Sequence, residues 1–182
     1  MMAKDLYERR RLYRAQAPIR VVCRTIEDAQ VDLDPYDPVL ALPEAMQIAD
    51  LQSGLDQELR PLWRQINNTY PEIARYLSVQ ERKQDLLLHA LIDAGLHTLE
   101  SWPGIDLSEG GVSFHHTQLF APRQAVHLLL IQSGSLHVAA TARILHCREN
   151  AGDYILGTEF VCLREHDRQA IVRLAQRRPA QP

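Results

Sequence analysis

Apolar residues in the middle of the chain recur at helical spacing. One series advances in steps of three or four residues with an eleven-residue period, at positions 48, 51, 55, 59, 62, 66, 70, 73 and 77. A second series has the seven-residue period of a coiled coil, at positions 77, 80, 84, 87, 91 and 94. The two series predict two helices, over about residues 43–68 and 70–99.

Pro71 marks the junction between the predicted helices. It follows Asn67-Asn68-Thr69 and precedes Glu72, an order typical of a helix start. The two helices could therefore be joined end to end with a kink. We expect Trp102-Pro103-Gly104 to close the second helix, because proline and glycine interrupt helical segments.

The pattern changes to that of β-strands on both sides of the helical segment. β-Branched or alternating apolar residues fill 18–26, 112–116, 125–132, 136–146 and 154–163, with turns predicted at 133–135 and 150–153. Residues 27–43, rich in Asp and Pro, indicate an acidic connector. Residues 164–178 have the spacing of an amphipathic helix with Ile171, Leu174 and Ala175 inward. Short strands and one closing helix predict a small β-barrel.

The composition is that of an ordinary globular protein: 182 residues, 46% hydrophobic and 24% charged. The longest apolar runs, such as Leu128-Leu129-Leu130-Ile131, are far too short to span a bilayer. Three widely spaced cysteines without a CxxC motif indicate reduced thiols. The first fourteen residues are charged and lack the apolar stretch of a secretion signal. We therefore expect a cytoplasmic protein.

The net charge of −3 is unevenly distributed along the chain. Residues 1–14 carry five basic and two acidic residues, a net charge of +3, whereas residues 27–72 carry two basic and ten acidic residues, a net charge of −8. The protein as a whole has no electrostatic reason to bind nucleic acid. The basic arm at residues 1–14 nevertheless stands out against an acidic body.

Arginines in the basic arm are the first candidate binding residues. Arg9, Arg10 and Arg14 could reach one ligand together, and guanidinium groups pair with phosphate oxygens and stack on flat bases. The arm taken alone is more typical of a solvated basic segment, or of a tether to acidic lipid or nucleic acid.

A second candidate lies at residues 106–111, Asp-Leu-Ser-Glu-Gly-Gly. Asp106 and Ser108 are two residues apart, so on a strand they point to the same face. The carboxylate can accept from guanine N1–H and N2–H, and the hydroxyl can donate to a phosphate or ring acceptor. Gly110 and Gly111 would permit a turn or bulge beside a ligand. The alternative is a polar loop, because Asp, Ser and Gly favour turns.

No spacing in the sequence indicates catalysis or metal binding. The eight histidines form no HxxxH or HExxH motif, and His115 and His116 would lie on opposite faces of a strand. A nucleophile elbow, a P-loop and a paired catalytic carboxylate are all missing from the sequence. We therefore expect a binding protein without a cofactor or metal rather than an enzyme.

The arginine arm, the DxSxxG motif and the ending YILGTEFVCL followed by a helix together resemble the PilZ domain family. Arg9, Arg10 and Arg14 match its arginine motif, and Asp106, Ser108 and Gly111 match its second motif. Gly157 matches a position where the family often has glycine. The resemblance covers residues 8–26 and 105–178. It implies a six-stranded β-barrel with a C-terminal helix, and binding of the bacterial second messenger cyclic di-GMP.

The predicted helices separate the two halves of this resemblance. The expected organisation is a basic arm and first strand at 1–26, a connector and helical insertion at 27–104, and the rest of the barrel with its helix at 105–182. The insertion resembles that of a PilZ subgroup. Its seven-residue repeat favours self-association through residues 43–99, as a tetramer first and a dimer next, with Gln80 and Gln84 at core positions.

Two functions fit these expectations. The first is a non-enzymatic cyclic di-GMP receptor that signals to an unidentified protein effector. The alternative is an oligomeric PilZ-like scaffold that binds no nucleotide.

Overall fold

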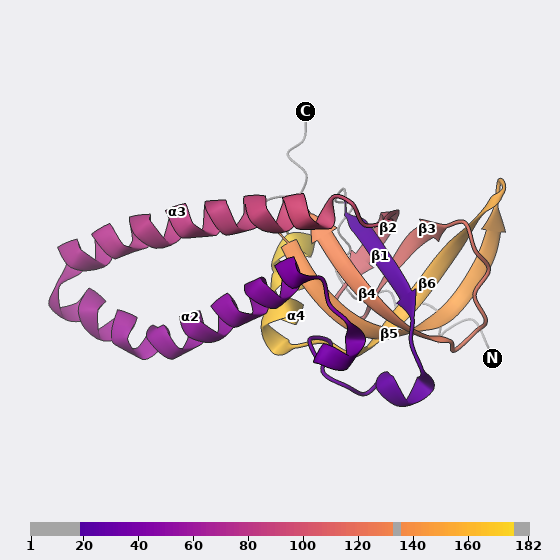
Figure 1. Cartoon of the computed structure of the whole chain (residues 1–182), viewed down its shortest axis with the longest axis horizontal. Helices are drawn as coiled ribbons and strands as arrows, with labels where there is room; N and C mark the ends of the chain where they lie inside the picture. Colours follow the sequence, from indigo (N-terminus) through magenta and orange to yellow (C-terminus); the bar gives the residue numbers. More distant parts are fainter. Residues whose placement is uncertain (1–18, 133–135, 177–182) are drawn as a thin grey trace, which may run out of the picture. The chain divides into compact units, whose positions relative to one another are not determined.

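The computed structural model describes residues 19–132 and 136–176. These residues divide into two compact units, a barrel unit formed by residues 19–40, 100–132 and 136–176, and a helical unit formed by residues 41–99. Figure 1 labels the helices and strands of both units.

Six antiparallel strands close into the barrel in the order β1-β2-β3-β6-β5-β4. Their bounds are β1 Arg20–Thr25, β2 Trp102–Ser108, β3 Gly111–His116, β4 Ala125–Gln132, β5 Leu136–Asn150 and β6 Asp153–Cys162. The helix α4, Glu165–Gln176, follows β6. The predicted six-stranded barrel with a C-terminal helix and a two-helix insertion is therefore confirmed.

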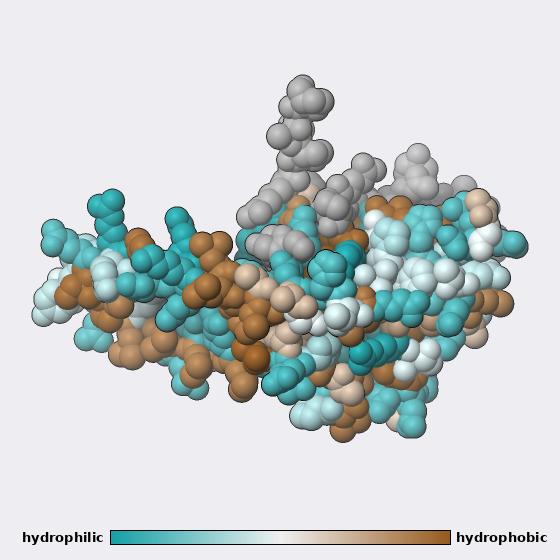
Figure 2. All heavy atoms as spheres, turned by 45° about the horizontal axis from the view of Figure 1, so that its top comes forward, coloured by the Kyte–Doolittle hydropathy of each residue, from teal (hydrophilic) through white to brown (hydrophobic). Residues whose placement is uncertain are grey.

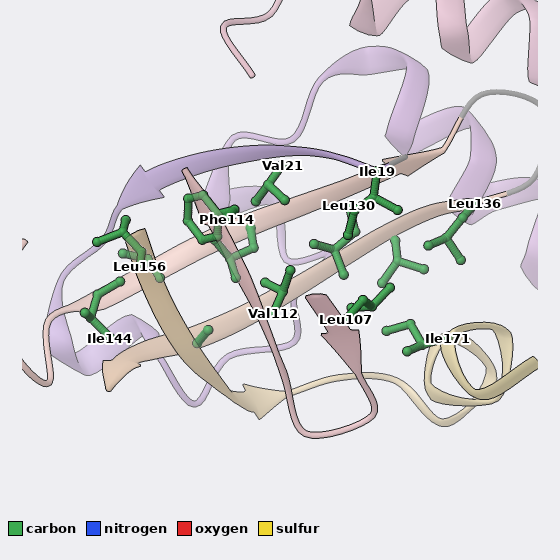
Figure 3. Packing of buried hydrophobic residues seen from close by; sticks show 14 of the residues in the cluster. Ile19, Val21, Leu107, Val112, Phe114, Leu130, Leu136, Ile144, Leu156 and Ile171 are labelled. Atoms are coloured by element: carbon green, nitrogen blue, oxygen red, sulfur yellow. The ribbon is translucent and has the colours of Figure 1, made fainter. Parts of the chain in front are cut away.

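The barrel core is filled by alternate residues of every strand, as the period-two pattern predicts. Val21, Phe114 and Leu156 are completely buried, and Ile171 of α4 joins the same cluster. Figure 3 shows Ile171 directed from α4 toward Leu107 of β2. Burying a side chain of this size is worth about 1.5–3 kcal/mol, so α4 is held to one end of the barrel by its apolar face.

The expectation that Trp102-Pro103-Gly104 closes the second helix is wrong. This segment begins β2. The second helix ends earlier, at Leu96. Trp102 and Pro103 pair with Val21 and Arg20 of β1, and the Gly104 N–H donates to the Ile19 carbonyl at 2.9 Å. Proline is tolerated at the start of a strand, where its missing N–H interrupts little of the ladder. Pairing with β1 thus overrides the local turn preference of this segment.

The acidic connector is packed against the outside of the barrel. It contains two 3₁₀ turns, Asp28–Gln30 and Pro38–Leu40. The Thr141 hydroxyl donates to the Val31 carbonyl at 2.6 Å, and His127 Nε2–H donates to the Pro35 carbonyl at 2.9 Å. The Tyr36 hydroxyl donates to Asp167 of α4 at 2.9 Å. The connector between β1 and residue 40 is therefore an ordered part of the barrel unit.

The helical unit is an antiparallel hairpin of α2, Glu44–Thr69, and α3, Pro71–Leu96 (Figure 1). Gln52 Nε2 donates to Asp85 at 3.2 Å, and a Cβ added to Gly95 would lie 3.0 Å from the Ala45 Cβ. These contacts pair the start of α2 with the end of α3. The prediction that α2 and α3 are joined end to end is therefore wrong. Tyr70, with a non-helical backbone (φ −138°, ψ 72°), lies where the chain reverses before Pro71.

Pro61 lies inside α2 rather than ending it. A proline within a helix removes one backbone hydrogen bond and crowds the carbonyl four residues earlier, which bends the helix without necessarily stopping it. Within the described ranges, neither α2 nor α3 nor α4 combines the length and the apolarity that crossing a membrane requires.

Candidate functional site

The DxSxxG segment forms the β2–β3 hairpin of the barrel unit. Ser108 pairs with Gly111, so Glu109 and Gly110 make the turn. Leu107 is fully buried in the core, whereas Asp106 and Ser108 on either side of it are half-buried. Strand alternation therefore places the Asp106 carboxylate and the Ser108 hydroxyl together on the outer face.

A β-bulge sets the direction of Asp106. Gly104 pairs with Phe114 and Asp106 pairs with Ser113, so Ile105 is an extra residue in β2. Strict alternation from the inward position of Gly104 would direct Asp106 into the core. The bulge shifts the alternation by one residue and brings Asp106 to the outside, a use of bulges that is common beside binding sites.

Two hydrogen bonds hold the hairpin turn against the rest of the barrel, and a third closes the hairpin itself. The Phe160 N–H donates to the Gly110 carbonyl at 2.9 Å, and the Arg168 guanidinium of α4 donates to the Glu109 carbonyl at 3.1 Å. The Ser108 hydroxyl lies 3.3 Å from the Gly111 carbonyl and donates to it. The backbone of the motif is therefore fixed by β6 and α4 as well as by β2 and β3.

Gly111 is required by the packing of two strands. A Cβ at this position would lie 2.0 Å from the Thr158 carbonyl oxygen of β6. The Thr158 hydroxyl also donates to the Val112 carbonyl at 2.9 Å. Gly111 therefore allows β3 and β6 to approach closely, a structural role that the sequence did not reveal.

Gly157 lies two strands from Asp106 on the same face. Asp106 pairs with Ser113 of β3, and Ser113 pairs with Gly157 of β6. Both glycines are buried: Gly111 lies against the backbone of Thr158, and Gly157 lies beneath the imidazole of His146. The structure thus brings Asp106, Ser108, Gly110, Gly111 and Gly157 to one region of the barrel.

Arg9, Arg10 and Arg14 lie outside the described residues. The carboxylate, hydroxyl and glycine half of the predicted site is therefore described, and the arginine half stays a prediction from the sequence.

The buried histidine His116 belongs to the core rather than to the candidate site. It is 5% exposed, its ring centroid lies 4.4 Å from that of Trp102, and its Nδ1 accepts from the Gln118 N–H at 2.9 Å. Burial lowers its pKa, against the opposing effects of Glu100 and the Gln118 hydrogen bond. His115, its neighbour, is on the outer face, as predicted from strand alternation.

No group of three or more His, Cys, Asp or Glu side chains among the described residues is placed to hold a metal ion. The three cysteines, Cys23, Cys147 and Cys162, are free thiols. Burial raises the pKa of the Cys23 thiol to about 12, so this group stays protonated at neutral pH.

Together, the closed barrel, the closing helix and the β2–β3 hairpin define a small six-stranded β-barrel domain. The chain belongs to the PilZ domain family, whose model matches residues 80–177. The resemblance inferred from the sequence motifs is thereby confirmed. The matched range includes the DxSxxG segment and Gly157 but not the arginine arm.

Among solved structures, the chain is similar to a pathogenic protein from Xanthomonas campestris, described as a tetrameric PilZ domain self-assembled through a helical bundle. The identity is 15%, the likeness covers 92% of this chain and 88% of that one, and the TM-score is 0.57. At this identity the likeness shows the fold, including the helical segment.

A more limited similarity relates the chain to the inhibitor of motility MotI/DgrA from Bacillus subtilis, with 13% identity and a TM-score of 0.40. It covers 43% of this chain and 41% of that protein, so the chain corresponds to less than half of the length of that relative. No match was found among curated proteins.

Proposed function

We propose that this chain is a non-enzymatic receptor for cyclic di-GMP that passes the signal to a protein effector in the cytoplasm. Membership of the PilZ family supports the proposal, because domains of this family are generally receptors for that nucleotide. The nucleotide would lie between Arg9, Arg10 and Arg14 of the basic arm and the outer face of the β2–β3 hairpin.

The observation that carries the proposal is the shared outward direction of Asp106 and Ser108, in a row of paired strands that also contains Gly157. A carboxylate at this position can accept from the N1–H and N2–H of guanine. The arginines would pair with phosphate and stack on the base. These are complementary groups for the two parts of a guanine nucleotide.

Calorimetric titration of the intact chain with cyclic di-GMP tests the proposal. We expect saturable binding in the wild type and a loss of about 1.5–3 kcal/mol of binding free energy in Arg10→Ala and in Asp106→Ala, because each removes a charge-assisted contact. Asp153→Ala is the matched control, since it removes an exposed carboxylate near the β5–β6 turn.

Thermal unfolding of the same variants separates binding from folding. We expect Asp106→Ala to leave the melting temperature nearly unchanged, because Asp106 is not part of the hydrophobic core of the barrel. Folded wild-type protein that gives no binding heat with micromolar cyclic di-GMP would sink the receptor proposal.

A second candidate function, assembly through the helical unit, rests on a different observation. The series with seven-residue spacing is largely exposed on α3: Leu77 is 40%, Leu87 73% and Leu91 54% exposed. The buried residues of α3 are instead Ala74, Ile92 and Leu96. The coiled-coil series is therefore left unburied within one chain.

The eleven-residue series of α2 is exposed in the same way, at Leu51, Leu55, Leu59 and Leu62. Figure 2 shows apolar side chains gathered along the helical unit. A contiguous exposed apolar surface of this kind marks an interaction site, and its coiled-coil spacing suits a second copy of the same helices. The tetramer described for the Xanthomonas campestris relative makes a four-chain bundle the first form to test.

Light scattering of the purified chain over a range of concentrations tests this assembly. We expect a mass of about four times the 20.8 kDa of one chain, and a single-chain mass for the double variant Leu87→Glu/Leu91→Glu. Arg82→Glu, at an exposed position of the same helix, is the control and should stay assembled. A wild-type monomer at every concentration would remove assembly but leave the receptor proposal intact.

A further inference from the structure

His146 of β5 faces the outside of the barrel because of a second β-bulge. Ile144 pairs with Thr158 and His146 pairs with Gly157, so Leu145 is an extra residue in β5. Ile144 lies in the core, and Cys147 packs against that core. Because Ile144 and Cys147 both point inward, the side chain of His146 points to the outside of the barrel.

The same bulge places His146 in line with the candidate site. Asp106, Ser113, Gly157 and His146 pair in turn across β2, β3, β6 and β5, and form one row on the outer face. With neighbouring strands about 4.8 Å apart, the row spans about 14 Å. Asp106 and His146, at its two ends, both follow an extra residue in their strands.

The imidazole of His146 occupies the space that the missing side chain of Gly157 leaves. A Cβ added to Gly157 would lie 2.2 Å from Cε1 of His146, 2.6 Å from Nε2 and 2.8 Å from Nδ1. The N–C–N side of the ring therefore faces Gly157 at contact distance. A ligand ring could reach the Gly157 backbone only where this imidazole gives way.

Packing alone holds the imidazole in this position. Within residues 19–132 and 136–176, His146 makes no hydrogen bond or ion pair. Burial lowers its pKa, and the nearby Arg148 lowers it further, so both favour the neutral form of the ring. A neutral ring without a hydrogen bond can change rotamer at small cost.

We propose that His146 determines ligand access at the candidate site, because its ring and the base of a bound guanine nucleotide compete for the space over Gly157. This role rests on the proposed receptor function. The residue acts through the size of its side chain, so a smaller residue at position 146 opens the site and a ring of similar size keeps it restricted.

Nuclear magnetic resonance of the ligand-free protein tests the contact without any ligand. We expect a nuclear Overhauser effect between the Cε1 proton of His146 and the α-protons of Gly157. If the effect is missing in protein with a folded barrel, the proposal for His146 is overturned and the receptor function is untouched.

Calorimetry with cyclic di-GMP then tests the competition, using His146→Ala, His146→Phe and the exposed control His97→Ala. We expect His146→Ala to bind about two- to tenfold more tightly than wild type, the range for releasing one ordered side chain. His146→Phe should bind no more tightly than wild type, and His97→Ala should match it. Binding by His146→Ala when wild type shows none would support the proposal most strongly.

The remaining outcomes contradict the proposal in distinguishable ways. Weaker or unchanged binding by His146→Ala, with wild type binding normally, would mean that the ring contacts or ignores the ligand rather than excluding it. No binding by either protein, with the nuclear Overhauser effect present, would instead remove the receptor function and the access role with it.

Discussion

Ala151 has an unfavourable backbone conformation for a residue with a side chain. It forms the β5–β6 turn with Gly152, and both residues have positive φ, 51° and 99°. Such two-residue turns match the twist of the flanking strands but favour Asn or Gly at the first position. The turn itself was predicted from Asn150-Ala151-Gly152-Asp153, and the strain at Ala151 follows from its geometry.

We predict that Ala151→Gly raises the free energy of unfolding by about 0.5–1 kcal/mol, because relief of the left-handed conformation outweighs the added freedom of the unfolded chain. Chemical denaturation measures the change. The same substitution inside α4, Ala170→Gly, should lower stability by about 1 kcal/mol. Destabilisation by both variants would contradict the strain at Ala151.

The two glycines of the candidate site should respond differently to alanine. We predict that Gly111→Ala lowers the free energy of unfolding by about 1–3 kcal/mol, because its Cβ would meet the Thr158 backbone carbonyl. Gly157→Ala should cost less, because its Cβ would meet the movable ring of His146. Equal costs in chemical denaturation would contradict this difference. Loss of binding in Gly111→Ala therefore cannot be assigned to a ligand contact.

At the level of elements, the connector between β1 and residue 40 is the segment that sequence reasoning described least well. Its Asp and Pro content predicted turns, which the structure contains. The bonds from Thr141 and His127 to connector carbonyls join residues about 100 positions apart, and no local pattern indicates them. Arg164 adds an ion pair to Asp34 at 2.9 Å, with its guanidinium 4.2 Å from the Tyr36 ring centroid.

His127 makes the packing of this connector sensitive to pH. Burial lowers its pKa below the ordinary 6.5, the hydrogen bond to Pro35 opposes this, and Arg24 adds to the lowering. Below pH 6.5 the unfolded chain therefore binds a proton that the folded chain does not. The stability contributed by neutral His127 is present above that pH and is lost as the pH falls toward the folded pKa.

We predict that the free energy of unfolding decreases between about pH 7 and pH 5, and that His127→Gln decreases less over this range, because its amide can donate to Pro35 without titrating. Denaturation curves at several pH values provide the measurement. His116 and His146, whose pKa values are also lowered, remain in both proteins. Identical pH profiles would show that His127 does not contribute.

Bulges explain which parts of the site the sequence could not predict. Hydrophobic alternation gives the positions of β3 and β4 closely, but the extra residues Ile105 and Leu145 are defined only by pairing with neighbouring strands. His146 was overlooked, although counting back from the two-residue turn at 151–152 pairs it with Gly157 before the bulge is reached. Pairing between distant strands also explains why Trp102-Pro103-Gly104 is a strand rather than a helix end, because this segment pairs with β1.

For the whole molecule, the period of the apolar pattern predicted the fold class correctly, because helices of 26 residues and a barrel with alternating burial leave clear signals. The reversal between α2 and α3 was missed, since one extended residue, Tyr70, decides it. The candidate site was predicted from two motifs, the arginine arm and DxSxxG, that resemble those of the PilZ family. The geometry of the DxSxxG half follows from the barrel, and the contribution of the arginines stays a prediction.

The most direct test of the receptor function is a cyclic di-GMP titration followed by amide nuclear magnetic resonance of the intact chain. We predict saturable shifts that gather at residues 106–113 of the β2–β3 hairpin and at Gly157, and that are lost in Asp106→Ala but not in Asp153→Ala. Folded protein whose spectrum does not change at saturating nucleotide, or changes only in α2 and α3, would contradict the account.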